Sequence, residues 1–313
     1  MNKNTLRQLR VYGIVFFITL SCIAGCNRKA KNPLESLRTG TIHISVDESF
    51  RPVIEEQISV FEKSFPGSKI IADYKTEASC FKDFFSDTSI RMIIVTRGLT
   101  NEEDRFFIDS LNYSPRWNTI AYDAITLIVN SKSNDTLFTM ERLKSQLSGL
   151  TNRDQKVVFD GLNATSTVRF ALDSILKGQK FDTSVVKAVK NSREVIDFVS
   201  ANENAVGFVG ISWIGNPEDS AQVDMLRKVK IGYVSCNTCG DTPFVKPMQL
   251  SILTRRYPLV RGLYYIVKEN YNGLGSGFAN FMKNERGQLI FKRAYLGTTM
   301  GFYMRNVKIN EKL

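Results

Sequence analysis

From residue 41 onward, short apolar runs alternate with longer stretches in which apolar residues recur at helical spacing. In residues 51–65, for example, Val53, Ile54 and Phe61 fall on one face of a helix. Residues 91–95 are almost wholly apolar, which is typical of a strand covered on both faces. The pattern predicts strands at 41–46, 69–74, 91–95, 120–130, 156–159, 205–209 and 248–253, and helices at 51–65, 79–85, 101–111, 166–176, 192–201, 257–271, 277–283 and 285–295.

This alternation predicts an α/β fold with a mostly parallel sheet. The chain has 313 residues, more than one domain usually uses, so we expect two lobes. In an open parallel sheet, ligands bind outside the carboxyl ends of the strands, where the next helices begin. The loops at these strand ends are therefore the first candidates for a binding site.

Several of these loops carry hydroxyl and charged side chains: 47–49, 96–100 and 160–167, with 76–79 as a fourth candidate. Free amides at the start of a helix, flanking hydroxyls and an arginine together suit an oxyanion. Each loop taken singly is more simply explained by ordinary helix capping. Only their combination indicates a small-anion site.

The first 26 residues have the layout of a secretory signal. Lys3, Arg7 and Arg10 precede an apolar stretch at 11–20, and small residues then lead into Cys26. The apolar stretch is shorter than the roughly 20 residues of a membrane span, which argues against an uncleaved anchor. The ending resembles the bacterial lipobox, which implies cleavage before Cys26 and acylation of its thiol. We expect a lipoprotein of the cell envelope that faces the periplasm.

The charge of the chain limits its partners. Removing residues 1–25, which carry three basic and no acidic residues, lowers the net charge from +11 to +8 and leaves 288 residues. An excess of basic over acidic residues suits binding to nucleic acid, to an anionic surface or to a small anionic ligand. Export and the scattered positions of the basic residues argue against nucleic acid. A small anion and the membrane surface remain as expected partners.

Histidine and cysteine limit the chemistry further. The chain has one histidine, His43, whereas Ser-His-Asp and Cys-His mechanisms and most catalytic zinc sites need histidine. We therefore expect that the protein is not an enzyme and that it binds neither a metal nor a cofactor. Cys236 and Cys239 form a CxxC motif, for which a disulfide or two idle thiols is the favoured interpretation. Redox chemistry and half of a metal site stay open as alternatives.

The order of these segments resembles the PstS-type phosphate-binding lipoproteins of ABC importers over nearly the whole length after residue 26. The resemblance is carried by Thr-Arg-Gly-Leu-Thr at 96–100, the hydroxyl-rich loop at 163–167, and Ala-Val-Gly-Phe-Val-Gly-Ile-Ser at 205–212. Its most specific part is Tyr-Pro-Leu-Val-Arg at 257–261, with a Gly-Phe pair at 277–278 and a Gly-Gln pair at 287–288. We interpret these later residues as structural.

The resemblance implies a type II periplasmic-binding fold, with two α/β lobes joined by paired crossover strands that close on an anion. It also implies a ligand site made of hydroxyls, amides and one guanidinium. The implied divisions are a signal peptide at 1–25, a tether at 26–39, lobe one at 40–122 plus 245–313, and lobe two at 123–244. The implied ligand-binding residues are Ser49, Ser79, Thr96, Arg97, Thr165, Ser166 and Thr167.

The chain departs from the family at two of these loops. Acidic residues stand at 47–48, where the family usually has small and hydroxyl residues, and Asp160 stands near the place of a family arginine. Asp47 and Asp160 are candidate acceptors for a proton of phosphate, which sulfate lacks. The alternative, given equal weight, is that these acids cap helices or pair with Arg97 and that the ligand is not phosphate.

Three functions follow from these patterns. The leading hypothesis is a lipid-anchored receptor that captures inorganic phosphate between two lobes and delivers it to the membrane subunits of an ABC importer. The second is a receptor for another small anion. The third is an envelope interaction lipoprotein that kept the fold without ligand binding, which the acidic first loop favours.

Overall fold

The computed structural model describes residues 35–151, 154–161, 165–240 and 243–302. The predicted signal peptide, the lipid site at Cys26 and residues 162–164 of the hydroxyl-rich loop lie outside these ranges. Among the described residues, no helix has both the length and the apolar character needed to cross a membrane.

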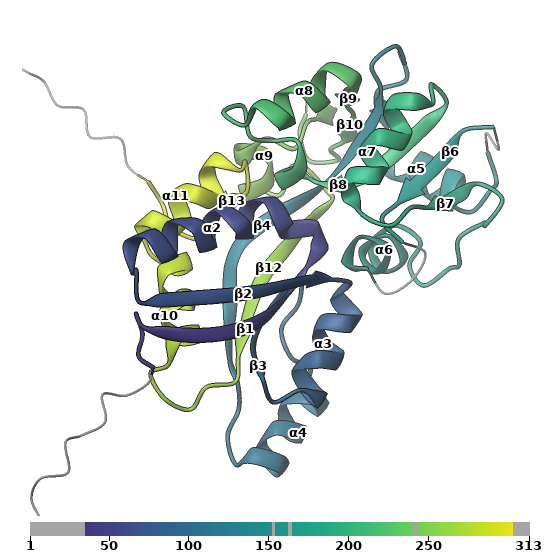
Figure 1. Ribbon diagram of the computed structural model, residues 1–313. Helices are drawn as coiled ribbons and strands as arrows, with labels where there is room; N and C mark the ends of the chain where they lie inside the picture. Colours follow the sequence, from purple (N-terminus) through teal and green to yellow (C-terminus); the bar gives the residue numbers. More distant parts are fainter. Residues whose placement is uncertain (1–34, 152–153, 162–164, 241–242, 303–313) are drawn as a thin grey trace, which may run out of the picture.

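One half of the molecule, which we call lobe one, is built on three parallel strands. Strand β1 (Gly40–Asp47) lies between β2 (Ser68–Lys75) and β3 (Ile90–Val95). Met92 and Ile93 belong to different apolar clusters, because neighbouring strand residues point to opposite faces of a sheet. Both faces are therefore covered (Figure 1), by η1 (Glu48–Phe50), α2 (Arg51–Ser64), α3 (Glu77–Ser86), α4 (Asn101–Leu111), α10 (Leu274–Lys283) and α11 (Glu285–Arg293).

Two antiparallel strands, β4 (Arg116–Asn130) and β12 (Val260–Val267), form the centre of the sheet. Strand β12 lies between β3 and β4 and runs antiparallel to both. The predicted helix at 257–271 is therefore wrong. Its branched and aromatic residues alternate between buried and partly exposed positions, as in a strand. The sheet is mixed, with parallel outer strands around an antiparallel centre.

Strand β4 also begins the other half of the molecule, which we call lobe two. From Ile125 it pairs with β8 (Ala205–Gly210), and β6 (Lys156–Phe159) and β7 (Val186–Ala188) continue the sheet in parallel. The predicted lobe boundaries after residues 122 and 244 stay a prediction. Lobe two also contains α5 (Met140–Leu147), α6 (Ser166–Phe170), its π-helical continuation η2 (Ala171–Ile175), α7 (Ser192–Ala201), η3 (Ile211–Trp213), α8 (Ser220–Lys228) and β9 (Val229–Ile231).

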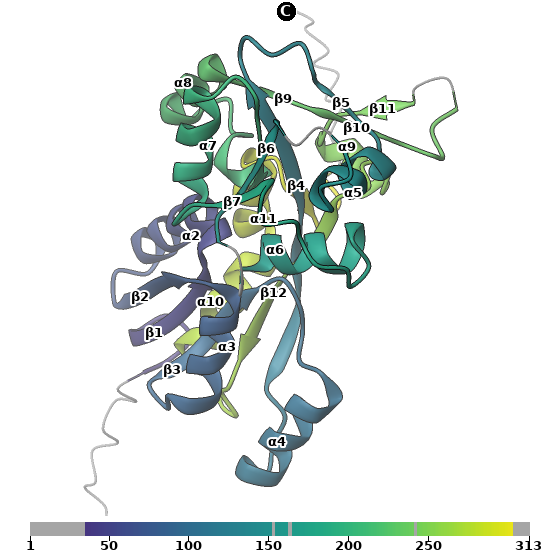
Figure 2. The same cartoon turned by 90° about the vertical axis from the view of Figure 1, so that its right-hand side faces the viewer.

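A small second sheet lies at the far end of lobe two (Figure 2) and consists of β5 (Leu137–Phe138), β10 (Tyr233–Ser235) and β11 (Phe244–Val245). The chain then forms helix α9 (Gln249–Leu253), so the predicted strand at 248–253 is also wrong. Six apolar-rich residues do not distinguish a helix from a strand by periodicity alone. Here Oγ of Ser251 accepts a hydrogen bond from the amide of Met248, which fixes the start of a helix. The short strand β13 (Gly297–Thr298) pairs with β4.

Candidate functional site

The two lobes meet where β1 ends and α6 begins. Ser49, in η1, is fully buried, and its Oγ lies 3.4 Å from Oγ of Ser166 and 3.5 Å from Oγ1 of Thr167. Thr165 is the N-cap of α6, because its Oγ1 accepts a hydrogen bond from the amide of Val168. Four predicted hydroxyl residues thus lie together at the contact between the lobes.

Asp160, at the end of β6, accepts hydrogen bonds from these hydroxyls. Its Oδ1 accepts from Oγ1 of Thr165 at 3.0 Å, and its Oδ2 accepts from Oγ1 of Thr167 at 3.3 Å. Oγ of Ser49 donates to the same Oδ2 across 3.4 Å. Burial raises the pKa of Asp160, although the hydroxyls and the nearby Arg261 favour its ionised form.

Asp47 is the last residue of β1 and lies beside this cluster. Its Oδ1 accepts a hydrogen bond from the amide of Ser49 at 3.0 Å, so the side chain caps η1. Burial raises the pKa of Asp47 to about 7, with Glu77 acting in the same direction and Arg261 opposing it. Both acids that we predicted as proton acceptors therefore lie next to the hydroxyls.

The buried cation of this cluster is Arg261 on β12. Its Nη1 donates to Oγ of Ser166 at 2.7 Å, and its Nε donates to Oδ2 of Asp123 at 2.8 Å. Burial raises the pKa of Asp123, although Arg261 opposes this shift. Among the residues that the structure describes, Nη2 of Arg261, Oδ1 of Asp123 and Oδ2 of Asp47 have no hydrogen-bond partner. Buried polar atoms without partners indicate room for a water molecule or a ligand group.

Arg261 is absent from the predicted site residues because its segment, 257–271, was predicted to be a helix with a structural role. One signal in the sequence did point to it. Asp123 is the only charged residue in the apolar run at 120–130. A charge inside an apolar strand needs a partner, and a basic residue is the partner that neutralises it.

A second polar contact joins the lobes between α3 and α6. Glu77, the first residue of α3, accepts hydrogen bonds from the amide of Thr96 at 2.9 Å and from its Oγ1 at 2.5 Å. Nε of Arg169, on α6, donates to the same carboxylate at 2.7 Å. Burial alone would raise the pKa of Glu77, but Arg169 and Thr96 outweigh burial and hold the pKa below its usual value. A carboxylate of the chain therefore uses the donors that an anionic ligand would need.

A third carboxylate also crosses between the lobes. Glu48, in η1 of lobe one, accepts hydrogen bonds from the amide of Ser192 at 3.2 Å and from its Oγ at 2.9 Å. Ser192 is the first residue of α7, where a negative charge is favoured. Burial nevertheless raises the pKa of Glu48.

Beside the Glu77–Arg169 pair lies a cavity of about 410 Å³. It is lined by Glu77, Ala78, Phe81, Arg97, Thr165, Val168, Arg169 and Leu172. The lining residues come from both lobes, so this cavity is the open part of the cleft. Another cavity, of about 460 Å³, lies beside Phe65 and Phe281 and is lined by other residues.

Three predicted residues do not contact the hydroxyl cluster. Thr96 contacts Glu77 and Arg169 instead. Arg97 lines the cavity, but its guanidinium donates to both carboxylate oxygens of Glu103, at 2.6 and 2.8 Å, and lies 3.7 Å from the ring centre of Phe81. Ser79 shares a 2.8 Å hydrogen bond with Thr76 at the start of α3. The role expected for Arg97, the main cation beside the hydroxyls, is held by Arg261 because Glu103 holds Arg97 at the edge of the cleft.

In the part of the chain that the structure describes, no group of three or more His, Cys, Asp or Glu residues is arranged to hold a metal ion. The acids of the cleft instead contact hydroxyls, amides and guanidiniums. The site is therefore suited to a ligand that exchanges hydrogen bonds with them.

The chain is similar to known solute-binding proteins over most of its length. It is 20% identical to the phosphate-binding protein PstS of Borreliella burgdorferi across 304 residues, which cover 92% of this chain and 98% of that protein. The fold is similar to that of a putative phosphate ABC transporter substrate-binding protein from Clostridium perfringens, with bound phosphate. That similarity has a TM-score of 0.68 and 21% identity, and covers 83% of this chain and 100% of the other.

An ABC-type phosphate transport receptor from Vibrio cholerae has the same architecture, with a TM-score of 0.58 and 18% identity, over 82% of this chain and 99% of that one. These likenesses confirm the predicted two-lobed α/β fold and the resemblance to PstS-type proteins. The sequence also matches the PBP superfamily domain over residues 32–286. The chain therefore belongs to the PBP superfamily.

Proposed function

We propose that this protein is an extracytoplasmic solute-binding protein, not an enzyme, that captures inorganic phosphate between its lobes for an ABC importer. A lipid on Cys26 would hold it at the membrane, close to the membrane subunits that accept the ligand. The relatives support this proposal, since both the Borreliella protein and the Clostridium structure are described as phosphate-binding. The proposal rests further on the chemistry of the cleft.

The single observation that carries the proposal is the buried guanidinium of Arg261. Its Nη1 donates to Ser166, while its Nη2 has no partner among the described residues. An oxyanion with several acceptor oxygens satisfies such a donor. It also accepts from the hydroxyl of Ser49, whose contact with Asp160 breaks when the lobes separate. Hydrogen bonds from a charged donor are the strong ones in a buried site.

Binding requires the lobes to separate first. Oγ of Ser49 and Oγ of Ser166 lie 3.4 Å apart, whereas an oxyanion between them needs a hydrogen bond of about 2.7 Å on each side. The lobes are joined by the Glu77–Arg169 pair and by the contact of Glu48 with Ser192. We therefore interpret this arrangement as a closed form, which opens by hinge motion to admit the ligand.

The acids of the cleft give the proposed site its selectivity. Asp47 and Asp160 lie beside the donors, and an ionised acid repels an anion without protons. Phosphate near neutral pH keeps at least one proton and donates it to a carboxylate, whereas sulfate has none. The same acids therefore favour phosphate and disfavour sulfate.

Calorimetric titration of the full chain in detergent with phosphate, and then with sulfate, tests the proposal. We expect one-to-one binding of phosphate and no heat from sulfate. A Ser166→Ala variant should bind phosphate more weakly by about 0.5–1.5 kcal/mol, because one hydroxyl donor is lost. A Ser86→Ala variant is the matched control, because Ser86 is exposed and donates to the carbonyl of Lys82, and it should keep its affinity. Absence of phosphate binding by folded, ligand-free protein would refute the proposal.

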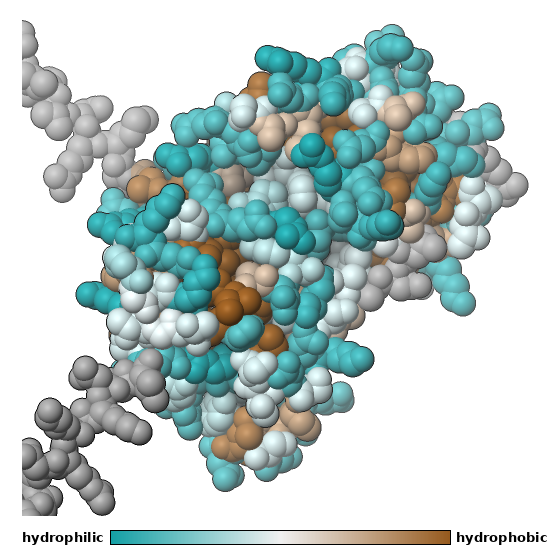
Figure 3. Space-filling model, viewed as in Figure 1, coloured by the Kyte–Doolittle hydropathy of each residue, from teal (hydrophilic) through white to brown (hydrophobic). Residues whose placement is uncertain are grey.

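A second function is favoured by the contacts of Glu77. Its carboxylate already uses the donors of Thr96 and Arg169, as expected of a scaffold that needs no anion. Such a protein would act through its surface, and α4 exposes Phe106, Ile108 and Leu111 at the lower tip of lobe one (Figure 3). Ile108 and Leu111 lie one helical turn apart on the same side of α4, and exposed apolar patches mark interaction sites. The titration separates the two functions, because this one predicts no response to phosphate.

A further inference from the structure

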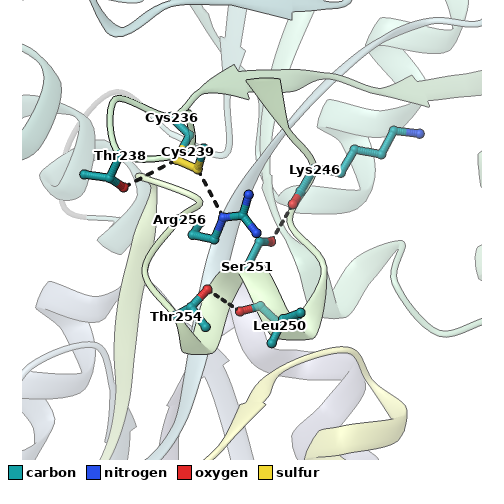
Figure 4. Close-up of a disulfide and its surroundings, with 8 residues drawn as sticks. All are labelled: Cys236, Thr238, Cys239, Lys246, Leu250, Ser251, Thr254 and Arg256. Carbon is teal, nitrogen blue, oxygen red and sulfur yellow. Dashed lines mark hydrogen bonds between the residues drawn. A yellow bond between two sulfur atoms is a disulfide. The ribbon is translucent and has the colours of Figure 1, made fainter. Parts of the chain in front are cut away.

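The CxxC motif lies outside the cleft and has no part in the proposed function. Cys236 and Cys239 form a disulfide in the loop that joins β10 to β11, with their Cα atoms 5.5 Å apart (Figure 4). Only two residues separate them. A disulfide that closes so short a loop restricts the unfolded chain less than one that closes a long loop, so it adds little to the stability of the fold.

A guanidinium contacts one sulfur of this disulfide. Nε of Arg256, in the segment that follows α9, lies 3.1 Å from Sγ of Cys239 (Figure 4). The other sulfur, Sγ of Cys236, lies 3.6 Å from Oγ1 of Thr238. Lys246 is drawn in the same view, but its ammonium lies 4.7 Å from the ring centre of Tyr233. The two cysteines therefore differ in their electrostatic surroundings.

They also differ in access. Cys236 is buried, with 8% of its surface exposed, whereas Cys239 is partly exposed. A nearby cation attracts an incoming thiolate and stabilises the thiolate that remains after reduction. Access and charge thus both favour Cys239 as the sulfur that exchanges.

We propose that Cys236 and Cys239 form a thiol–disulfide exchange site for an external dithiol, with Cys239 as the cysteine that is attacked and Cys236 as the cysteine that leaves. In reduction, one thiolate of the dithiol attacks Sγ of Cys239, the bond between the two cysteines breaks, and Cys236 leaves as a thiolate that takes a proton. The second thiol of the dithiol loses its proton and attacks the first sulfur of the dithiol, which is bonded to Cys239 in the mixed disulfide. Cys239 then leaves as a thiolate beside Arg256. Two electrons pass to the protein, and the dithiol becomes a disulfide.

Alkylation of variants that keep only one cysteine of the CxxC motif tests the role of Arg256. In the reduced full chain, Cys236→Ser leaves Cys239 free, and Cys239→Ser leaves Cys236 free. We expect iodoacetamide, with the labelled site located by mass spectrometry, to give Cys239 an apparent pKa below the usual value of about 8.5 and Cys236 a higher one. Adding Arg256→Gln should slow the alkylation of Cys239 at pH 7 several-fold.

The neighbouring Arg255→Gln is the control, because the guanidinium of Arg255 lies over the ring of Tyr122 and not over a sulfur. It should leave the rate unchanged. Cys80 is buried, and burial raises the pKa of its thiol, so it alkylates slowly in every variant. An apparent pKa for Cys239 at or above the usual value, or equal effects of the two arginine variants, would overturn the proposal.

Exchange itself is measured with dithiothreitol as the dithiol. We expect the oxidised full chain to be reduced while its circular dichroism and tryptophan fluorescence stay those of the folded protein. The Cys236→Ser variant, mixed with an aromatic disulfide reagent, should hold a stable mixed disulfide on Cys239. Reduction that occurs only when the protein unfolds would show a structural disulfide and refute the exchange site.

Discussion

Arg261 and Asp123 lie directly opposite each other on neighbouring strands, β12 and β4, and are joined by a 2.8 Å hydrogen bond from Nε to Oδ2. Both side chains are almost completely buried. The pair lies close to Ile125, where β4 stops pairing with β12 and begins to pair with β8. One ion pair thus stabilises the junction of the lobes and also orients a guanidinium toward Ser166.

The first prediction concerns this pair. An Arg261→Gln variant leaves the carboxylate of Asp123 buried without its cation, which should lower the free energy of unfolding by about 3–5 kcal/mol. Urea unfolding of the full chain measures the change. Arg293→Gln is the control, because Arg293 is half-exposed in its pairs with Glu56 and Glu218 and should change stability by about 0–1 kcal/mol.

The double variant Arg261→Met with Asp123→Leu checks the reason for this loss. It removes both charges and keeps apolar volume, so it should recover most of the lost stability. If the double variant is as unstable as the single one, the loss comes from packing and not from an unpaired charge.

The second prediction concerns the pH dependence of stability. Burial raises the pKa of Asp47 to about 7 from its usual value near 4, so the folded protein binds a proton that the unfolded chain releases. The stability contributed by this proton is fully present below about pH 4 and is lost as the pH rises toward about 7. In Asp47→Asn this part of the pH dependence should be absent. Melting temperatures of both proteins between pH 4 and pH 8 measure the difference.

Asp123 and Asp160 also have raised pKa values, so the variant should keep part of the decline. Glu203→Asn is a suitable control, because Glu203 is exposed in its pair with Lys132. If the melting temperatures of wild type and Asp47→Asn change with pH in the same way from pH 4 to pH 8, the prediction is wrong.

The sequence predicted the outer parts of the fold well, because they obey local rules. The helix at 51–64 has a clear apolar face, and the strand at 90–95 is apolar throughout its buried part. Strand β12 was mistaken for a helix because its identity is set by β3 and β4, which lie far from it in the sequence. Pairing of this kind leaves little trace in local periodicity.

The same distinction explains the candidate site. Ser49, Thr165, Ser166 and Asp160 lie at the ends of strands or the starts of helices, where a general rule places ligand sites. Arg97 satisfies the same rule, yet its guanidinium is paired with Glu103, six residues along the chain, and not with the hydroxyls. Competition among nearby charges is decided by side-chain geometry, which spacing in the sequence does not give.

The third prediction concerns the carboxylate between α3 and α6. Glu77→Gln removes a charge that would repel an anion and frees the guanidinium of Arg169 from its ion pair. We expect phosphate to bind about tenfold more tightly, which corresponds to about 1.4 kcal/mol. Calorimetric titration measures the change, with Glu203→Gln as an exposed control that should have no effect. Weaker binding by Glu77→Gln would show instead that the carboxylate accepts a proton from the ligand.

The fourth prediction concerns the pH dependence of phosphate capture. As the pH falls, phosphate gains a proton and Asp47, with its pKa of about 7, becomes neutral. Both changes reduce the repulsion between the ligand and the acids of the cleft. The neutral carboxyl group of Asp47 then donates a hydrogen bond to the ligand in place of the one that its carboxylate accepted, so the affinity for phosphate should rise from pH 8 to pH 6. Titrations at half-unit steps measure this rise. Asp47→Asn should flatten it, because one of the two groups no longer titrates. An affinity that falls toward pH 6 in the wild type would mean that the cleft prefers the dianion, which three buried acids beside one buried guanidinium make unfavourable.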